Sequence, residues 1–148
     1  MIAKKQKPPP SQRRFPHAWT ELVYLCRKIH YWLHVRGSRP RANRYQTRIE
    51  QVLDELPQDG MAIIRQEALA LLNELKGDLS KSIFHRAKEI ELTERLHQLA
   101  EAPTCDAKTR AYMLQYRDTE ALQARRVILQ ELLKKKRDVS NNGARKAH

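Results

Sequence analysis

Apolar residues recur at helical spacing along most of this chain, and that spacing constrains the fold more than any other feature. The clearest run occupies Ile64, Ala68, Leu71, Leu75, Leu79, Ile83, Ala87 and Ile90. Residues three or four apart lie on one face of an α-helix, so the run predicts a helix with one buried stripe. A chain of 148 residues that is 41% hydrophobic and 31% charged, with only four Gly, is typical of a helical bundle. The sequence therefore predicts an all-α protein.

Gly and Pro residues divide the first half of the chain into two expected helices. The first should span about 17–36 and the second about 40–56. Between them, Gly37 can close the first helix and Ser38 can cap the second. Pro57 follows the second helix and ends it.

The second half predicts a long antiparallel helical hairpin. One helical stretch should run from about 61 to 102, and we favour a continuous or gently kinked helix because the apolar spacing survives across Gly77. The alternative is that Gly77 ends one helix and that Asp78 or Ser80 caps the next. We expect its exposed positions to form a solvated acidic face that includes Glu67, Glu74, Glu89, Glu91 and Glu94. After Pro103 a last helix should run to about Arg137, and the short connection implies antiparallel neighbours. We thus expect about four helices in a single domain over 17–137, with the basic N-terminal pair packed on the hairpin.

Both ends of the chain are expected to be disordered. Residues 1–16 form a basic arm in which Pro8, Pro9 and Pro10 favour polyproline II over helix. Residues 138–148 contain almost nothing to bury. No apolar run approaches the ~20 residues of a membrane span, and the N-terminus lacks the apolar segment of a secretion signal. We therefore expect a cytoplasmic protein that does not contact a membrane.

The net charge of +12 is unevenly distributed. Residues 1–48 hold twelve Lys or Arg and a single acid, Glu21. Residues 49–103 hold six Lys or Arg and eleven acids, and residues 104–148 hold eleven and five. A basic head, an acidic middle and a basic end indicate separate surfaces for separate partners. The acidic middle could also neutralise part of the basic head in the fold.

Basic and aromatic residues concentrate between Tyr24 and Arg48, a stretch without Asp or Glu. At 100° per residue, the core side of its first helix holds Trp19, Leu22, Leu25, Cys26, Ile29, Trp32 and Leu33. The opposite side holds Tyr24, Arg27, Lys28, Tyr31 and His34. Rings beside cations suit nucleic acid, because bases stack on π faces and guanidinium groups pair with phosphate. The alternative is a solvated helix face that carries two amphipathic tyrosines.

Three arginines repeat at helical spacing at the start of the second expected helix. They are Arg41, Arg44 and Arg48, within the stretch without Asp or Glu, and we expect nothing acidic at hand to neutralise them. Their charge adds to the positive end of the helix dipole. This favours an external anion, and a phosphate backbone is the commonest candidate. The alternative is that acids of a later helix pair with them.

The sequence contains no recognisable catalytic or cofactor-binding motif. We find no phosphate-binding Gly loop, no nucleophile elbow and no CxxC pair, and the two cysteines, Cys26 and Cys105, are expected to be free thiols. The one metal-like spacing is Cys26-x3-His30-x3-His34, whose residues spread over two helical turns and do not converge on one ion. We interpret it as a core Cys with two flanking His. We expect no metal, no cofactor and no enzymatic activity.

The sequence therefore predicts a non-enzymatic nucleic-acid-binding protein, an accessory subunit of a nucleoprotein assembly. We expect the contacts to come from Tyr24, Arg27, Lys28, Tyr31, Arg36, Arg39, Arg41, Arg44 and Arg48. Exposed rings favour RNA or single strands over duplex DNA, since rings stack on unpaired bases. The alternative is a helical adaptor or assembly subunit that binds a partner protein through its long hairpin. A second apolar stripe, exposed on the hairpin, would indicate that alternative.

Overall fold

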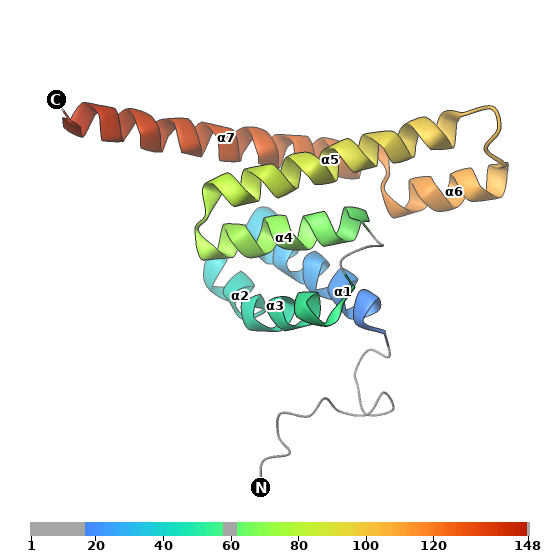
Figure 1. Ribbon diagram of the computed structural model, residues 1–148, viewed down its shortest axis with the longest axis horizontal. Coiled ribbons are helices and arrows are strands. Elements are labelled where there is room, and N and C mark those ends of the chain that lie inside the picture. The colour runs from blue at the N-terminus through green and yellow to red at the C-terminus, as the bar shows by residue number, and fades with distance from the viewer. Residues whose placement is uncertain (1–16, 58–61, 148) are drawn as a thin grey trace, which may run out of the picture. The chain divides into compact units, whose positions relative to one another are not determined.

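The computed structural model describes residues 17–57 and 62–147, and these residues form helices joined by short turns (Figure 1). The predicted all-α class is confirmed. The chain divides into two compact units, residues 1–61 and 62–148, where we had expected a single domain over 17–137. Among the described residues, none of the helices has the length and apolar character needed to cross a membrane.

Unit 1 contains the expected N-terminal helical pair. Its elements are α1 (Ala18–His30), the π-helix η3 (Tyr31–Val35), α2 (Arg39–Asn43) and α3 (Gln46–Glu55). The predicted basic arm over 1–16 lies outside the described residues. Gly37 closes the first helix with φ of 64°, a conformation that favours Gly. Ser38 occupies the N-cap position of α2, but its side chain makes no capping hydrogen bond.

The second helix of the pair is divided, in contrast to the single helix expected over 40–56. The amide of Arg44 donates to Arg41 and that of Tyr45 donates to Ala42, both across three residues. Such tight bonds interrupt the α-helical ladder and separate α2 from α3. The three arginines that we expected at the start of one helix are therefore distributed over α2, the break and α3.

The core of unit 1 forms between α1 and α3. Its buried apolar residues are Leu22, Leu25, Cys26 and Ile29 on α1, Ala42 on α2, and Ile49, Val52 and Leu53 on α3. The four α1 residues belong to the predicted core face, which confirms that part of the prediction. Trp19, Trp32 and Leu33 were predicted on the same face but are only half-buried. Each fully buried Leu or Ile contributes roughly 1.5–3 kcal/mol, so this short seam holds the unit together.

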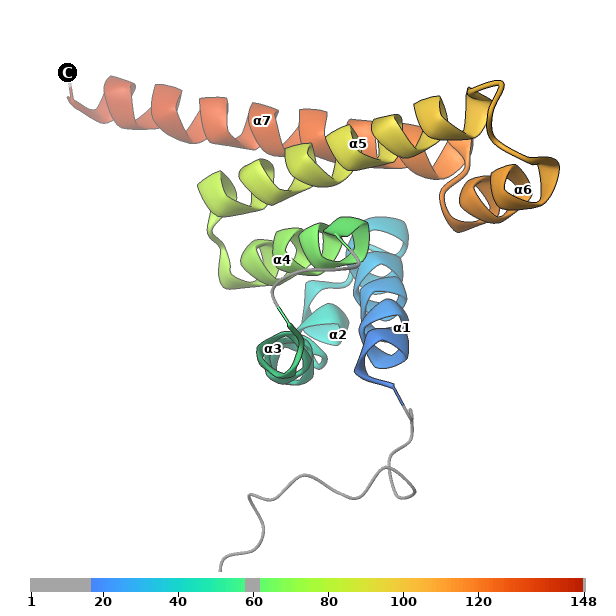
Figure 2. The ribbon, with the colours of Figure 1, turned by 45° about the vertical axis from the view of Figure 1, so that its right-hand side comes forward.

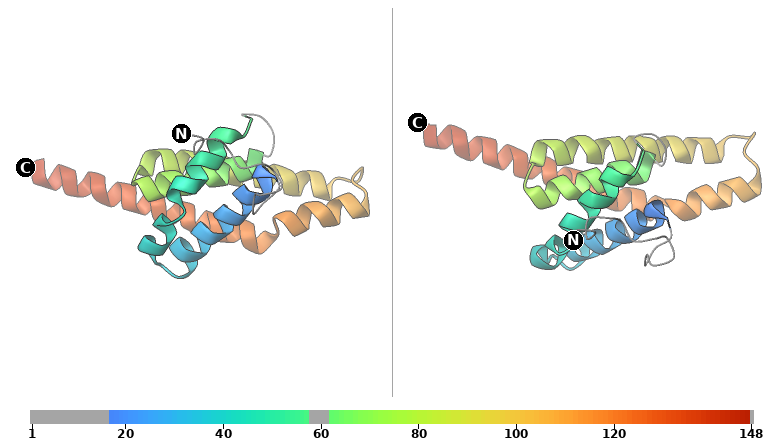
Figure 3. Two further views of the ribbon diagram at one scale, coloured as in Figure 1. Left: turned by 90° about the horizontal axis from the view of Figure 1, so that it is seen from below. Right: turned by 60° about the horizontal axis from the view of Figure 1, so that its bottom comes forward.

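Unit 2 is built around a helical hairpin. Its elements are α4 (Ala62–Lys76), α5 (Leu79–Glu101), α6 (Ala107–Tyr116) and α7 (Thr119–Ala147). Helix α4 packs antiparallel to α5, and α7 runs along another side of α5 (Figures 1 and 3). The short α6 packs on the C-terminal part of α5 (Figure 2). Buried apolar side chains from α4, α5 and α7 line these contacts.

The helical stretch expected over 61–102 is broken at Gly77, so the continuous helix that we favoured was wrong and the alternative, in which Gly77 ends one helix and Asp78 caps the next, is confirmed. Gly77 has φ of 79°, and the amides of Gly77 and Asp78 donate to the carbonyls of Glu74 and Asn73. This is the Schellman arrangement that ends helices. The side chain of Asp78 then accepts a hydrogen bond of 3.1 Å from the amide of Lys81 and caps α5. Apolar spacing survives the break because α4 and α5 bury equivalent faces against each other.

The C-terminal region also differs from the expectation of one helix over 104–137 and a disordered tail over 138–148. The chain breaks before α7, where Asp118 accepts a hydrogen bond of 2.7 Å from the amide of Ala121. Asp118 therefore supplies the helix start that the break requires. Helix α7 then continues without interruption to Ala147.

Candidate nucleic-acid interface

All nine residues predicted to contact nucleic acid lie in unit 1. Tyr24, Arg27 and Lys28 are on α1, Tyr31 on η3, Arg36 after η3, Arg39 and Arg41 on α2, Arg44 in the break and Arg48 on α3. Each is exposed or half-buried, so each has access to solvent. The structure separates them into three groups with different surroundings.

The first group comprises Tyr31 and four arginines, Arg36, Arg39, Arg41 and Arg44, and we call these four arginines the basic turn. These four exposed arginines surround the sharp turn at Gly37. Two backbone hydrogen bonds fix the turn. The amide of Arg36 donates to the carbonyl of Tyr31 at 2.8 Å, and the amide of Ser38 donates to the carbonyl of Trp32 at 2.6 Å. These backbone hydrogen bonds fix the main chain of the turn from which the arginine side chains extend.

The basic turn lies within a stretch of the chain that contains no acid. The sequence has no acid from Leu22 to Ile49. The acids that follow on α3 are Glu50, in the middle of that helix, and Asp54 and Glu55 at its C-terminal end. The basic turn is thus a local concentration of positive charge along the chain.

Aromatic rings adjoin the basic turn. The guanidinium carbon of Arg41 lies 4.6 Å from the centroid of the Trp32 ring, which is a cation–π contact. The Tyr31 ring meets Trp32 edge-on, with centroids 5.0 Å apart, and Tyr31 is 42% exposed. Trp32, predicted in the core, is instead half-buried on the π-helix η3 and contacts Arg41.

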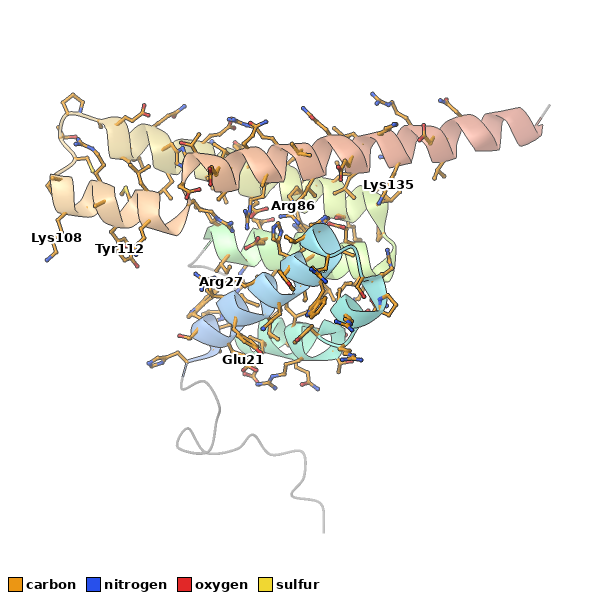
Figure 4. All side chains as sticks on the ribbon, turned by 180° about the vertical axis from the view of Figure 1, so that it is seen from behind. Glu21, Arg27, Arg86, Lys108, Tyr112 and Lys135 are labelled. Carbon is orange, nitrogen blue, oxygen red and sulfur yellow. The ribbon has the colours of Figure 1, made fainter. Side chains whose placement is uncertain are left out.

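The second group lies earlier on α1. The Nζ atom of Lys28 is 5.6 Å from the centroid of the Tyr24 ring. Arg27 is exposed on the same helix (Figure 4). A cation over an exposed ring contributes about 0.5–1 kcal/mol, so the pair is locally ordered yet remains open to solvent.

The third group is Arg48 alone, which is already bound to a carboxylate. Its Nε and Nη2 atoms donate to the two oxygens of Glu21, both at 2.6 Å. The hydrogen bond to Glu21 raises the pKa of Arg48. We expected nothing acidic near Arg48 and considered a later helix as the source of a partner, but the partner lies on the earlier helix α1. A separation of 27 residues hides this pairing in the sequence.

Cys26 and His30 on α1 and His34 on η3 are not grouped as metal ligands. Cys26 is buried in the core, whereas the rings of His30 and His34 contact each other with centroids 5.6 Å apart. Throughout residues 17–57 and 62–147, no three His, Cys, Asp or Glu side chains are grouped as metal ligands.

An unexpected ion cluster occupies the interior of unit 2. It comprises Glu67 and Glu74 on α4, Arg86 and Glu89 on α5, Arg117 before α7, and Arg125 on α7. None of these side chains is more than 12% exposed. Figure 4 shows Arg86 between the helices of the unit. The three carboxylates and three guanidinium groups balance in charge.

Two arginines of the ion cluster each bridge two carboxylates. Nη2 of Arg117 lies 2.7 Å from Glu67 and 2.9 Å from Glu89. Arg125 places Nη2 2.7 Å from Glu67 and Nε 3.2 Å from Glu89. Arg86 donates from Nη1 to Glu89 at 2.6 Å. These bonds join α4, α5 and α7.

The ion cluster corrects our expectation of a solvated acidic face, because three of its five acids are buried. The break at Gly77 folds α4 back against α5, so acids that would point outward on one long helix meet between two helices. Burial alone would raise the pKa of Glu67, but Arg117, Arg125 and Arg86 lower it to about 2. Burial raises the pKa of Glu89, and the attraction of Arg86 offsets only part of that rise. A neutral cluster offers no net charge to a ligand, so its role is in the fold.

Comparison of the chain with protein-family models, curated proteins and solved structures finds no match. Fold and function must therefore be argued from the charges, rings and contacts of the chain itself. Of its surfaces, the basic turn and its rings have the chemistry that fits a defined ligand class.

Proposed function

We propose that this chain binds nucleic acid without catalysing a reaction, as an accessory subunit of a nucleoprotein assembly. The observation that carries the proposal is the basic turn, four exposed arginines beside the Arg41–Trp32 stack and the exposed Tyr31 ring. A cluster of positive charge attracts a polyanion, and planar groups beside it suit stacked bases.

Phosphate contact is the main source of affinity in this proposal. Arg36 and Arg44 are exposed, and no ion pair within residues 17–57 involves either of them. A guanidinium fork matches the geometry of phosphate oxygens and remains charged at all relevant pH values. Binding to phosphate therefore adds contacts without breaking an existing ion pair at these two positions. Arg48 contributes less, because a phosphate would have to compete with Glu21.

The rings favour RNA or a single strand over duplex DNA. Bases of a single strand are free to stack, whereas those of a duplex are enclosed in their own stack. The Tyr31 ring and the guanidinium plane on Trp32 offer such platforms. We also propose a cytoplasmic location, with which the free thiols of Cys26 and Cys105 agree.

The alternative, a helical adaptor that binds a protein through its hairpin, rests on a second apolar stripe. The large apolar side chains exposed in the described part of the hairpin are Phe84 and Leu99 on α5, Tyr112 on α6, and Val127, Leu133 and Val139 on α7. On α5 the exposed positions between Phe84 and Leu99 include Lys88, Glu91 and Arg95, and on α7 four cations separate Leu133 from Val139. Charges divide these apolar side chains, so we place nucleic-acid binding first.

The proposal is tested by the triple variant R36Q/R39Q/R44Q in the full chain. Its control is K81Q/K88Q/K108Q, which removes the same charge from exposed positions of α5 and α6. Affinity for single-stranded RNA, single-stranded DNA and duplex DNA is measured from about 50 to 200 mM salt. Each lost phosphate contact reduces the slope of log K against log salt by about 0.7 for a single strand.

We expect the basic-turn variant to lose up to about 2 in that slope for a single strand, and the control to lose far less. Circular dichroism should show equal helix content for both variants. If the two variants bind like the wild type at every salt concentration, the basic turn is not the binding surface.

A further inference from the structure

Helix α7 carries a run of four cations, Lys134, Lys135, Lys136 and Arg137, in its middle and not at its end. We expected the last helix to end at Arg137, where cations would complement the negative end of its dipole. The helix instead continues to Ala147, beyond that run by more than two turns. Because the dipole effect falls off within the last turn, it does not account for these cations.

The same four side chains are exposed, and they outnumber the acids beside them on α7. The adjacent acids Glu131 and Asp138 are four residues from Lys135 and Lys134, the spacing for ion pairs along a helix. Within the described part of unit 2, no ion pair involves the four cations. Successive residues turn by 100°, so the cations surround most of the helix and repel one another. An anionic ligand would relieve that repulsion.

The cations lie where α7 leaves its neighbours. Leu132 is the last buried residue of α7, and residues 133–141 are all exposed. At this point the α4–α5 turn approaches α7, and Lys76 and Lys136 line one hollow of about 500 Å³, together with Asp78 and Ser80. Figure 1 shows α7 extending past that turn. Cations from α4 and α7 therefore share one surface.

The residue types restrict the kind of partner. No aromatic residue occurs in 133–141, so the surface offers no ring for a base. An anionic membrane would need a continuous apolar face opposite the cations, whereas the exposed apolar residues here are Leu133 and Val139, amid charge on all sides. Charge without rings or an apolar face fits the regular phosphates of a nucleic-acid backbone.

We propose that Lys76, Lys134, Lys135, Lys136 and Arg137 form a second phosphate-binding surface, which we call the α7 collar. The inference rests on the proposed function, because it assigns the α7 collar to the same nucleic-acid ligand. The basic turn adds base stacking, and the α7 collar adds backbone contact independent of sequence. One polyanion that engages both surfaces is held more tightly than by either alone.

The test is the variant K134Q/K135Q/K136Q, compared with K81Q/K88Q/K108Q, which removes the same number of lysine charges from the same unit. Gln and Lys have similar helix propensity, so the variant should retain the helix, as circular dichroism would show. Figure 4 places Lys108 at the opposite end of unit 2 from Lys135, which keeps that part of the control distant. Ligands are single-stranded RNA, duplex DNA and, separately, vesicles with anionic lipid.

We expect the α7 variant to reduce the salt slope by up to about 2 for the single strand and about 3 for the duplex. The control should bind like the wild type. Binding that falls only in R36Q/R39Q/R44Q would support the basic turn and overturn the α7 collar. Nucleic-acid binding that falls only in the α7 variant would support the α7 collar and overturn the basic turn. An α7 variant that loses vesicle binding but retains nucleic acid would overturn the inference in favour of a lipid surface.

Discussion

Replacing Arg86 by Met should destabilise unit 2 strongly, because Arg86 is the arginine that approaches all three carboxylates of the ion cluster. Its Nη1 atom lies 2.6 Å from Glu89 and 4.0 Å from Glu67, and Nη2 lies 3.7 Å from Glu74. Met has a similar length and no charge. The variant leaves three buried carboxylates with two guanidinium groups.

The magnitude follows from burial. At an effective dielectric constant of about 20, each of the two longer contacts represents roughly 4 kcal/mol of attraction before desolvation. Most of this offsets the cost of burying the guanidinium group, and Nε of Arg86 makes no hydrogen bond that would recover more. Leaving one buried charge uncompensated typically costs about 3–5 kcal/mol. For comparison, R126M breaks a pair with Glu94 whose side chains are 41% and 45% exposed, and should cost under about 1 kcal/mol.

The assay is urea unfolding of the full chain followed by circular dichroism and by Trp fluorescence. Both Trp residues belong to unit 1, so fluorescence reports that unit and circular dichroism reports both. A second variant, R86M/E89Q, restores the charge balance and should recover about 1–2 kcal/mol relative to the sum of the single changes. If R86M costs no more than R126M, or if the double variant costs the full sum, the cluster does not act as a balanced network.

Three further predictions concern single side chains. Since the pKa of Glu67 is about 2 in the folded state and about 4.5 when unperturbed, wild-type stability should fall by on the order of 3 kcal/mol as pH drops through that window. E67Q should show a flatter urea-unfolding profile over the same pH range. G77A should destabilise by about 1–2 kcal/mol, because Ala at positive φ is strained even though its Cβ would contact no neighbouring atom. If the helix were continuous at this position, Ala would instead stabilise it by about 1 kcal/mol. Y31A should weaken single-strand binding by about 1–3 kcal/mol in fluorescence titrations without changing the salt slope, whereas a changed slope at full affinity would exclude stacking.

The sequence predicted the helices better than their ends. Apolar spacing identified the α1 core face from Leu22 to Ile29, because periodicity depends on local residues alone. It did not reveal the break at Gly77, since two helices that pack on each other keep the same spacing as one long helix. Gly at that position is compatible with a continuous helix and with a helix end, and in the structure Gly77 ends α4.

Charge partners were the hardest feature to predict. Glu21 and Arg48 meet across 27 residues, and Glu67 and Arg125 across 58, so no local pattern indicates either pair. Acids and bases at helical spacing look alike whether solvated or buried. By contrast, the exposed arginines around Gly37 followed directly from a stretch without acids. The contact between Trp32 and Arg41 and the π-helical form of η3 had no signal in the sequence.

The most direct test of the proposed function is the salt dependence of wild-type binding to single-stranded RNA, single-stranded DNA and duplex DNA. We predict micromolar or tighter binding near physiological salt, with RNA or single-stranded DNA preferred over the duplex, because the Tyr31 ring and the Arg41–Trp32 stack add to phosphate contact. Weak binding that disappears equally for all three ligands as salt rises would contradict the proposal. It would reduce the basic turn to a generic positive surface.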